Sequence, residues 1–358
     1  MLSIAPLFMF AALAQGSAVS APPAPAPASE TDPKRSFDPV DARKAVEELA
    51  AALDENFVFP DKGQAYAAML RKNLADRAYD HFATPSAFAA KVTADLQAVH
   101  KDGHLRLRVA PTETAGSGPR RGGPPTASAV GKFGWVAPGV AYIDLRGFPG
   151  NDATTATVRR FLAQHRDAKT LIFDVRHNGG GGLDEMNLIF AQIFSRPATL
   201  VEMDIRKAVE EKHGTPFADN DPLLPKIAAP ASIIRRRHLA APAADQGPLK
   251  DATMFLLTSK ATFSAAEHFS LALKRTKRAT LIGEPTGGGA HFGGTIPMGA
   301  GYAAFIPVGR TFDPDTGVSW EAIGVKPDIA VPADQALDEA LKRAGVSGTG
   351  EAALARLH

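Results

Sequence analysis

Apolar residues recur every three or four positions through the first third of the chain. The spacing is regular in VDARKAVEELAAALDENF, which begins at Val40, and again in TPSAFAAKVTADLQAVH, where Thr84 and Pro85 form a typical helix cap and first turn. A period of about 3.6 residues is that of a helix with one buried face. The pattern therefore predicts a small N-terminal helical domain over residues 36–109.

The pattern changes in the second half, where short apolar runs alternate with amphipathic segments of helical length. The expected strands are GVAYIDLRGF, KTLIFDVR, ATMFLLTS and RATLIGE, and the expected helices are DATTATVRRFLAQHRD, GLDEMNLIFAQIFS and SAAEHFSLALKRT. Strands that alternate with helices are joined by right-handed crossovers, which give a largely parallel sheet with helices packed on it. The sequence therefore predicts an α/β core over residues 132–345.

Two segments follow neither pattern. The chain begins with an apolar stretch of signal-peptide length that is too short to span a membrane, and small residues that suit cleavage follow it, although no Lys or Arg precedes it. We predict a signal peptide over residues 1–21, a Pro/Ala-rich linker over residues 22–35, and export to the periplasm or the extracellular space. Pro, Gly, Ser and Thr also predict a linker or loop over residues 110–131.

Composition narrows the class of protein. The 358 residues are 45% hydrophobic and 22% charged, as in ordinary globular proteins. The 40 basic and 38 acidic residues nearly balance, so we expect no nucleic-acid partner. The chain has no cysteine, which excludes a Cys nucleophile and thiolate metal sites. We expect no cofactor and no metal.

Three loops follow predicted strands: DVRHNGGGG, TSKATFS and GEPTGGGAHFGG. Ligands of parallel sheets bind beyond the carboxyl ends of the strands, so we expect Gly179, Gly288 and Gly289 to line a substrate site. The glycine run either forms only a flexible turn or brings backbone N–H groups close to a substrate. It is not a phosphate-binding loop, because neither GK[ST] nor GxGxxG is present.

Ser264 lies where an apolar run ends and an amphipathic helix begins. With Glu267 three residues later, it fits a capping box. It also fits a nucleophile at a strand-to-helix turn, where the first helical N–H groups can stabilise an oxyanion. These residues alone favour the cap and leave both interpretations open.

Six segments, in one order over residues 38–331, resemble the C-terminal processing and tricorn-like serine peptidases, and most nearly the branch similar to interphotoreceptor retinoid-binding protein. They are DGHLRL, GVAYIDLRGF, LIFDVRHNGGGG, LLTSKATFSAAEHF, KRATLIGEPTGGGAH and WEAIGVKPDIAV. The resemblance implies a crotonase-like (ClpP-like) core, protein or peptide substrates, and Ser264 as nucleophile. Cap and nucleophile are then compatible roles.

This family has two catalytic arrangements. In one, a lysine base lies 25 residues after the serine, and that position is Gly289 in this chain, so the Ser–Lys dyad is absent. The tricorn-like arrangement implies His104 as base and Glu321 as the carboxylate that orients and stabilises the imidazolium. Gly103 departs from members that carry a hydroxyl residue before the histidine. Without the resemblance, His104 could be a solvated turn histidine and Glu321 a surface carboxylate.

Backbone N–H groups are expected to stabilise the oxyanion, from Ala265 after the nucleophile and from either Gly180 or Gly181. The segment after His104 is too short and unpatterned for a PDZ domain, so tail recognition by such a domain is not expected. The predicted function is an exported serine endopeptidase. The alternatives are a non-catalytic binding module for retinoid-like or fatty-acid ligands, and an esterase or small-peptide hydrolase with the same triad.

Other polar residues are expected to be structural or solvated. His268 lies four residues after Ser264, but it does not complete the HExxH spacing of a metal site. His177 and His291 flank the glycine loops, and we expect them to be solvated, with contact to the substrate as the alternative. We expect Glu284 to be structural, and Asp174 and Arg176 to form an ion pair that shapes the glycine loop.

Overall fold

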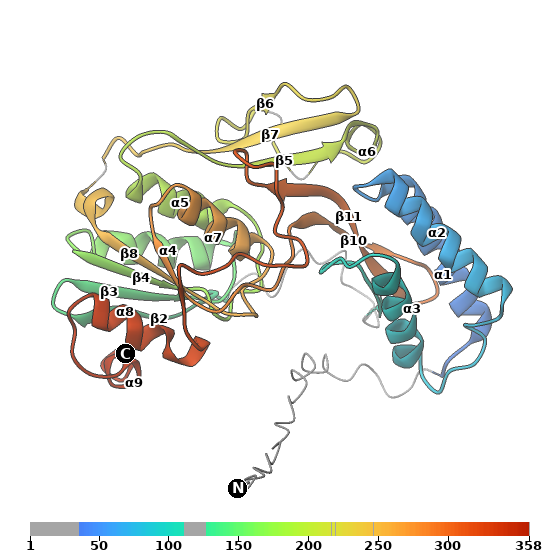
Figure 1. Cartoon of the computed structure of the whole chain (residues 1–358), viewed down its shortest axis with the longest axis horizontal. Coiled ribbons are helices and arrows are strands. Elements are labelled where there is room, and N and C mark those ends of the chain that lie inside the picture. The colour runs from blue at the N-terminus through green and yellow to red at the C-terminus, as the bar shows by residue number, and fades with distance from the viewer. Residues whose placement is uncertain (1–35, 111–126, 216, 219, 246, 358) are drawn as a thin grey trace, which may run out of the picture. The chain divides into compact units, whose positions relative to one another are not determined.

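The structure is a computed structural model that describes residues 36–110, 127–215, 217–218, 220–245 and 247–357 (Figure 1). The predicted signal peptide, the linker over residues 22–35 and most of the predicted linker over residues 110–131 lie outside the described residues. Within the described ranges, no helix is both long enough and apolar enough to cross a bilayer.

The predicted helical N-terminal region is present, and the structure shows three helices in it: α1 (Pro39–Asn56), α2 (Pro60–Ala75) and α3 (Pro85–Val99). Each begins with proline, whose missing N–H is not needed in the first helical turn. The side chains of Asp38 and Thr84 cap α1 and α3 by accepting backbone N–H bonds at 2.8 Å and 3.1 Å. The apolar face of each helix is buried.

The helices pack on an antiparallel sheet. Its strand order is β1-β11-β5-β7-β6, and β10 also pairs with β11. The six strands are β1 (Arg106–Val109), β5 (Ala198–Arg206), β6 (Lys226–Ile227), β7 (Ile233–Ala240), β10 (His291–Pro297) and β11 (Tyr302–Phe312). One hydrophobic cluster joins helix residues such as Leu49 and Phe88 to Leu107 and Ile306 of this sheet. The sequence analysis did not predict this sheet.

The second sheet has the order β12-β9-β8-β4-β3-β2, and all its strand pairs except β2–β3 are parallel. The predicted largely parallel sheet is therefore confirmed. Its strands are β2 (Val130–Ala137), β3 (Val140–Leu145), β4 (Thr170–Asp174), β8 (Thr253–Thr258), β9 (Thr280–Gly283) and β12 (Ile329–Ala330).

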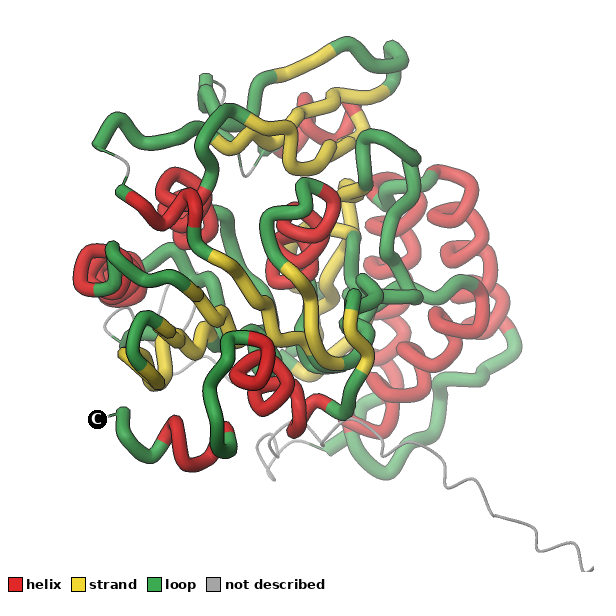
Figure 2. Tube along the Cα trace, turned by 60° about the vertical axis from the view of Figure 1, so that its left-hand side comes forward, coloured by secondary structure: helices red, strands yellow, loops and turns green. Residues whose placement is uncertain are grey.

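Helices cover both faces of the parallel sheet (Figure 2). Alternate residues of a strand point to opposite faces, and Leu171 and Ile172 of β4 accordingly belong to different hydrophobic clusters. One cluster packs against α4, α5 and α7, and the other against α8 and α9. The helices outside the N-terminal region are α4 (Asp152–Gln164), α5 (Asp184–Ile193), α6 (Lys207–His213), α7 (Ala265–Arg275), α8 (Ala336–Arg343) and α9 (Gly350–Leu354), with short 3-10 turns at Pro248–Asp251 and Ala333–Gln335.

Candidate active site

Ser264 lies at the start of α7, where the chain has left β8 and turned through residues 259–263. Its backbone dihedral angles are φ 57° and ψ −121°, in a region that residues other than glycine rarely occupy. An ordinary N-cap residue has an extended backbone. Ser264 is therefore held in a strained turn of the kind that presents a serine hydroxyl in front of a helix N-terminus.

Glu267 holds this turn from within the helix. Its buried carboxylate accepts the N–H of Ser264 at 2.9 Å, so the glutamate half of the predicted capping box is present. The same carboxylate accepts the Thr286 hydroxyl at 2.6 Å and the N–H groups of Gly288 and Gly289 at 2.7 Å each. Burial raises the pKa of Glu267, and these hydrogen bonds oppose the rise. The hydrogen bonds of Glu267 thus connect the turn at Ser264 to the loop that follows β9.

The glycine loop after β4 fits closely against the serine turn. Gly180 has φ 103°, and a Cβ at this position would lie 2.7 Å from the Cβ of Ser264, so only glycine fits. The N–H of Gly180 donates to Asn178 Oδ1 at 2.9 Å. In the part of the chain that the structure describes, the N–H groups of Gly181 and Ala265 donate no hydrogen bond. Of the two predicted glycine donors, Gly181 is therefore the one whose N–H has no acceptor among the described residues.

The glycines predicted to line the substrate site differ in their surroundings. Gly179 is exposed, whereas Gly288 and Gly289 are buried. A Cβ on Gly289 would lie 2.3 Å from the ring of Phe263 and 2.8 Å from Cε1 of His104. The loop after β9 therefore needs glycine in order to pass this close to the histidine.

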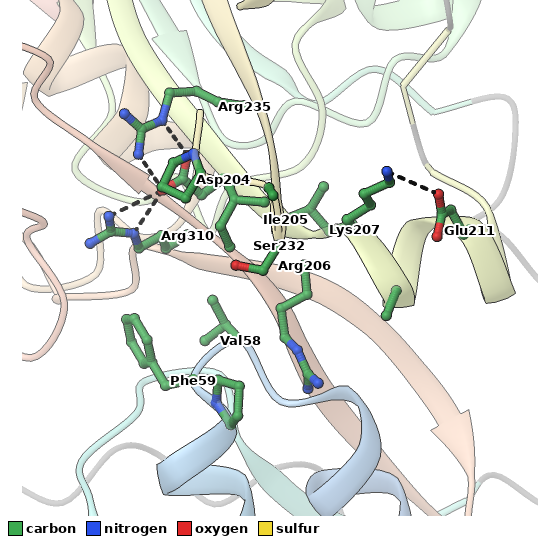
Figure 3. Close-up of a pocket in the computed structure, with 15 residues that line it drawn as sticks. Val58, Phe59, Asp204, Ile205, Arg206, Lys207, Glu211, Ser232, Arg235 and Arg310 are labelled. Carbon is green, nitrogen blue, oxygen red and sulfur yellow. Dashed lines mark hydrogen bonds and ion pairs between the residues drawn. The ribbon is translucent and has the colours of Figure 1, made fainter. Parts of the chain in front are cut away.

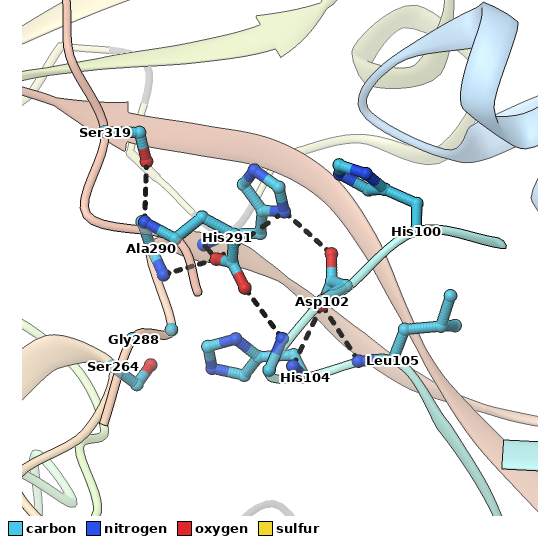
Figure 4. Close-up of polar contacts among 12 residues, drawn as sticks. His100, Asp102, His104, Leu105, Ser264, Gly288, Ala290, His291 and Ser319 are labelled. Atoms are coloured by element: carbon cyan, nitrogen blue, oxygen red, sulfur yellow. Dashed lines mark hydrogen bonds and ion pairs between the residues drawn. The ribbon is translucent and has the colours of Figure 1, made fainter. Parts of the chain in front are cut away.

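His104 lies between α3 and β1, and its side chain points toward Ser264 (Figure 4). Its ring packs between Phe263 and Phe305, with ring centroids 4.6 Å and 5.0 Å away. Only 7% of the residue is exposed, so it is not a solvated turn histidine. Burial lowers the pKa of His104 to about 4, although the charge of Asp102 opposes this. The ring is therefore neutral at pH 7 and able to accept a proton.

Glu321 lies in the loop between β11 and β12. Its carboxylate accepts the N–H groups of Gly103 at 2.7 Å, Ala290 at 2.6 Å and His291 at 3.0 Å. Its side chain is 10% exposed, so it is not a surface carboxylate. Burial raises the pKa of Glu321. Among the described residues, no hydrogen bond joins it to the ring of His104; Glu321 instead holds the backbone just before that histidine.

His291 was expected to be a solvated loop residue, and this prediction is wrong. The residue is 2% exposed, and its Nδ1 lies 2.7 Å from Asp102 Oδ2 and 3.6 Å from Glu321 Oε2. The loop carries His291 to the start of β10, whose pairing with β11 turns the side chain inward. His177, in contrast, is exposed as expected.

Asp102 is a site residue that the sequence analysis missed. It is 2% exposed, and Oδ1 accepts the N–H groups of His104 at 2.9 Å and Leu105 at 3.0 Å. An aspartate that accepts the N–H two residues later forms an Asx turn. The order Asp-Gly-His was therefore a usable signal that Asp102 fixes the backbone of His104.

Asp102, His291 and Glu321 are also the described residues that could together hold a metal ion, because their ligand atoms lie within 4.8 Å of one another. Their atoms already have partners: Asp102 Oδ2 receives the His291 ring, and the other carboxylate oxygens accept backbone N–H groups. An ion would have to displace these donors. The arrangement fits a hydrogen-bonded network better than a metal centre.

The remaining predicted polar residues have structural surroundings. His268 is buried, and its Nε2 lies 2.8 Å from Nδ1 of His238. Asp174 and Arg176 form the predicted ion pair at 2.6 Å, and Arg176 also donates to the carbonyl of Ala333 before α8. The N–H of Glu284 donates to the carbonyl of Thr258.

A cavity of about 660 Å³ lies between the α1–α2 junction, β5 and the loop before β7 (Figure 3). Its lining combines apolar residues such as Phe59 and Ile205 with the cations Arg206 and Lys207. None of the predicted catalytic residues lines it. Phe59 nevertheless packs against His291 with ring centroids 5.5 Å apart, so one residue of the cavity wall also contacts this buried histidine.

Several solved structures share this fold. The chain is similar to a candidate peptidase from Parabacteroides merdae (TM-score 0.55, 19% identity, covering 88% of this chain and 96% of that one). It is also similar to a lipoprotein from Streptococcus agalactiae (TM-score 0.52, 14% identity, covering 86% of this chain and 97% of that one). A third similar structure is a photosystem II D1 C-terminal processing protease (TM-score 0.50, 18% identity, covering 82% of this chain and 93% of that one). At these identities the similarity concerns the fold alone.

Two family models match the sequence itself. Residues 41–131 match the N-terminal domain of peptidase S41 in eukaryotic IRBP. Residues 139–331, more than half of the chain, match peptidase family S41. The chain therefore belongs to peptidase family S41, a family of serine-type peptidases.

Proposed function

We propose that the protein is an exported serine endopeptidase that cleaves proteins or peptides with Ser264 as nucleophile, His104 as base and Glu321 as the supporting carboxylate. Its core would be of the crotonase-like (ClpP-like) type, without a PDZ domain. The observation that carries the proposal is the strained turn at Ser264, with a buried neutral histidine pointing toward it (Figure 4). A simple helix cap needs neither feature.

The proposed reaction begins when Oγ of Ser264 attacks the substrate carbonyl while His104 accepts the hydroxyl proton. The N–H groups of Ala265 and Gly181 are free to stabilise the oxyanion. The imidazolium of His104 then gives its proton to the leaving amine, and an acyl-enzyme remains. Water hydrolyses the acyl-enzyme with the same histidine as base, which regenerates the serine.

Glu321 would act in this scheme through the backbone. It accepts the N–H of Gly103 at 2.7 Å, which fixes the peptide that precedes His104. Its negative charge would also favour the imidazolium that forms during proton transfer.

A non-catalytic binding module for fatty-acid or retinoid-like ligands is the second candidate, and the cavity of about 660 Å³ favours it (Figure 3). Val58, Phe59 and Ile205 offer apolar surface to a hydrocarbon chain, while Arg206 and Lys207 offer cations to a carboxylate. This function would not require Ser264 or His104.

A fluorophosphonate probe tests the peptidase proposal. The native protein should be labelled at Ser264 and should cleave unfolded casein, because a base and free N–H donors activate this hydroxyl. Ser264→Ala should abolish both activities. Ser270→Ala is the matched control on the same helix, because the Ser270 hydroxyl donates to the Ala266 carbonyl at 2.7 Å; this variant should keep both activities.

The opposite pattern would support the second candidate. Fatty-acid binding that survives Ser264→Ala, together with no labelling of the native protein, would exclude the peptidase mechanism.

A further inference from the structure

Two buried carboxylates hold the chain on both sides of the proposed catalytic histidine. Asp102 accepts the N–H groups of His104 and Leu105 at 2.9 Å and 3.0 Å, and Glu321 accepts the N–H of Gly103 at 2.7 Å. Three successive peptide groups are thus fixed by two side chains. The direction of the His104 side chain therefore depends on where these carboxylates lie.

The ligand atoms of these two carboxyl groups and of His291 lie within 4.8 Å of one another, and two carboxylates this close in a buried site repel each other unless a proton or a hydrogen-bond donor lies between them. In the described part of the chain, His291 is the residue that pairs with both, at 2.7 Å from Asp102 and 3.6 Å from Glu321. No Lys or Arg in this part forms an ion pair with either carboxylate.

The position of His291 is itself fixed from two directions. Its backbone N–H donates to Glu321 at 3.0 Å, while its ring donates to Asp102. On the other side, the rings of Phe57 and Phe59 pack edge-on against it, with centroids 6.3 Å and 5.5 Å away. The imidazole therefore has little freedom to leave the carboxylates.

We propose that His291 is a positioning residue for catalysis: its ring and its backbone N–H bridge Asp102 and Glu321, and this bridge holds the segment that carries His104 in its reactive position. The inference rests on the proposed function, since it assigns His291 a part in the same reaction. His291 acts through His104 and does not touch the substrate.

The bridge should also set the proton affinity of His104. The charge of Asp102 raises the pKa of His104, whereas His291 and Arg106 lower it. The other titratable groups near His291 are Glu321, His100 and Tyr66, since His291 affects the pKa of His100 and both carboxylates affect that of Tyr66. Replacing His291 or Asp102 should therefore move the pKa of His104 in the direction opposite to the effect of the residue that is lost.

His291→Asn tests the proposal directly. Asparagine keeps a donor near the position of Nδ1 but has no imidazole ring. We expect kcat to fall on the order of 100-fold, as for a small misplacement of a catalytic group, with little change in KM. The acid limb of the profile of kcat/KM against pH should move to higher pH, because His291 lowers the pKa of His104 in the unaltered protein.

Asp102→Asn should move the same limb in the opposite direction. The Asn carbonyl can still accept the two N–H groups that Oδ1 accepts, so the segment keeps its main support. Loss of the negative charge should lower the pKa of His104 and move the acid limb to lower pH. If His291 had only a structural role, the acid limb would not move in opposite directions in the two variants.

His165→Asn is the matched control. His165 is also buried, at 3% exposure, and its Nδ1 contacts the carbonyl of Phe161 at the end of α4, away from the proposed site. This variant should lose stability without changing kcat or the acid limb. An equal loss of stability in His291→Asn, with the limb unmoved, would overturn the proposal.

A measurement on the unaltered protein covers the case in which a variant does not fold. In ¹⁵N NMR spectra, His291 should carry a proton on Nδ1, the ring nitrogen that faces Asp102, and a ring whose single proton lies on Nε2 would overturn the proposal. Failure of the proposed function is a different result, because the unaltered protein would then neither react with the fluorophosphonate probe nor cleave casein.

Discussion

Ser264 combines a hydroxyl side chain with a backbone conformation that costs energy. A residue other than glycine at φ 57° is destabilised by about 1–3 kcal/mol relative to an ordinary conformation. The hydrogen bond from its N–H to Glu267 compensates part of this cost. The turn places the hydroxyl before the free N–H of Ala265, so the strain has a catalytic interpretation, whereas a helix cap alone would not require it.

This strain predicts different stabilities for two inactive variants. Ser264→Gly should be more stable than Ser264→Ala by about 1 kcal/mol, because glycine adopts positive φ without strain and alanine does not. Urea denaturation of the two proteins measures the difference directly. Equal stabilities, or a more stable alanine variant, would show that the turn is not strained.

His104 predicts the pH dependence of the reaction. The base must be neutral, and burial lowers its pKa from 6.5 to about 4. Activity should therefore persist as the pH falls through 6.5 and be lost only as it approaches the lowered value. The profile of kcat/KM against pH measures this. An acid limb of this profile at or above pH 6.5 would contradict the assignment of His104 as the base, and a limb above about pH 9 would indicate a lysine base.

At the scale of elements, the parallel sheet and its helices could be predicted because their signals are local. β4 and β8 are continuous apolar runs, and the helices α4, α5 and α7 each have one apolar face. The loops after β4, β8 and β9 also supply the glycines and the serine of the proposed site. The rule that ligands lie beyond the carboxyl ends of parallel strands is the reason why the sequence predicts a site at these loops.

The antiparallel sheet could not be predicted because its signals lie on separate strands. The segment IIRRRHLA of β7 carries three successive arginines and does not resemble a buried strand. In the fold, Arg235 and Arg237 lie opposite Asp204 and Glu202 of β5 and form ion pairs with them. Cross-strand pairs stabilise a sheet, but the pairing is not visible in either segment alone.

The same limitation explains why the prediction of a solvated His291 was wrong. Whether a loop residue such as His291 is solvated depends on the strand that it joins, and β10 pairs with β11, which in turn pairs with β1 next to His104. These contacts join parts of the chain that are about 190 residues apart. The motif GGGAH contains no information about them.

At the scale of the whole described chain, the proposed site is assembled from both sheets. Ser264 and the glycine loop follow strands of the parallel sheet, while His104 and His291 are attached to β1 and β10 of the antiparallel sheet. The N-terminal helices support the second group, since Phe57 belongs to their hydrophobic cluster and packs against His291. Loss of packing among these helices should therefore affect catalysis even though they carry no proposed catalytic residue.

Buried histidines should also make the folded state sensitive to acid. His238 and His268 face each other at 2.8 Å, and the other ring nitrogen of His238 lies 2.7 Å from Asn187 Oδ1. Since that amide oxygen accepts a proton from His238, the facing nitrogen of His238 must accept from His268. A proton on the accepting nitrogen of His238 would break this chain of hydrogen bonds, whereas a proton on His268 would go to its other ring nitrogen. Burial disfavours the charge there and lowers the pKa of His268 to about 3.

The sign of the effect follows from linkage. Below about pH 6.5 an unfolded histidine binds a proton, whereas folded His268 stays neutral, so stability falls as the pH decreases from 6.5 toward the lowered value. Urea denaturation between pH 7.5 and pH 5 should show the loss. Buried carboxyl groups with a raised pKa, such as Glu267, instead make stability rise as the pH decreases. The dependence of stability on pH is therefore more informative when it is compared between variants than when it is measured for one protein.

His268→Gln can still donate to His238 but does not titrate, so the dependence of stability on pH should weaken by on the order of 1 kcal/mol per pH unit below pH 6.5. His177→Asn is the control, because His177 is exposed, and it should leave the dependence unchanged. The prediction concerns the slope and not the absolute stability, so it holds even if the glutamine packs poorly. An unchanged slope in His268→Gln would contradict the prediction, because it would mean that His268 binds its proton as readily in the folded protein as in the unfolded one.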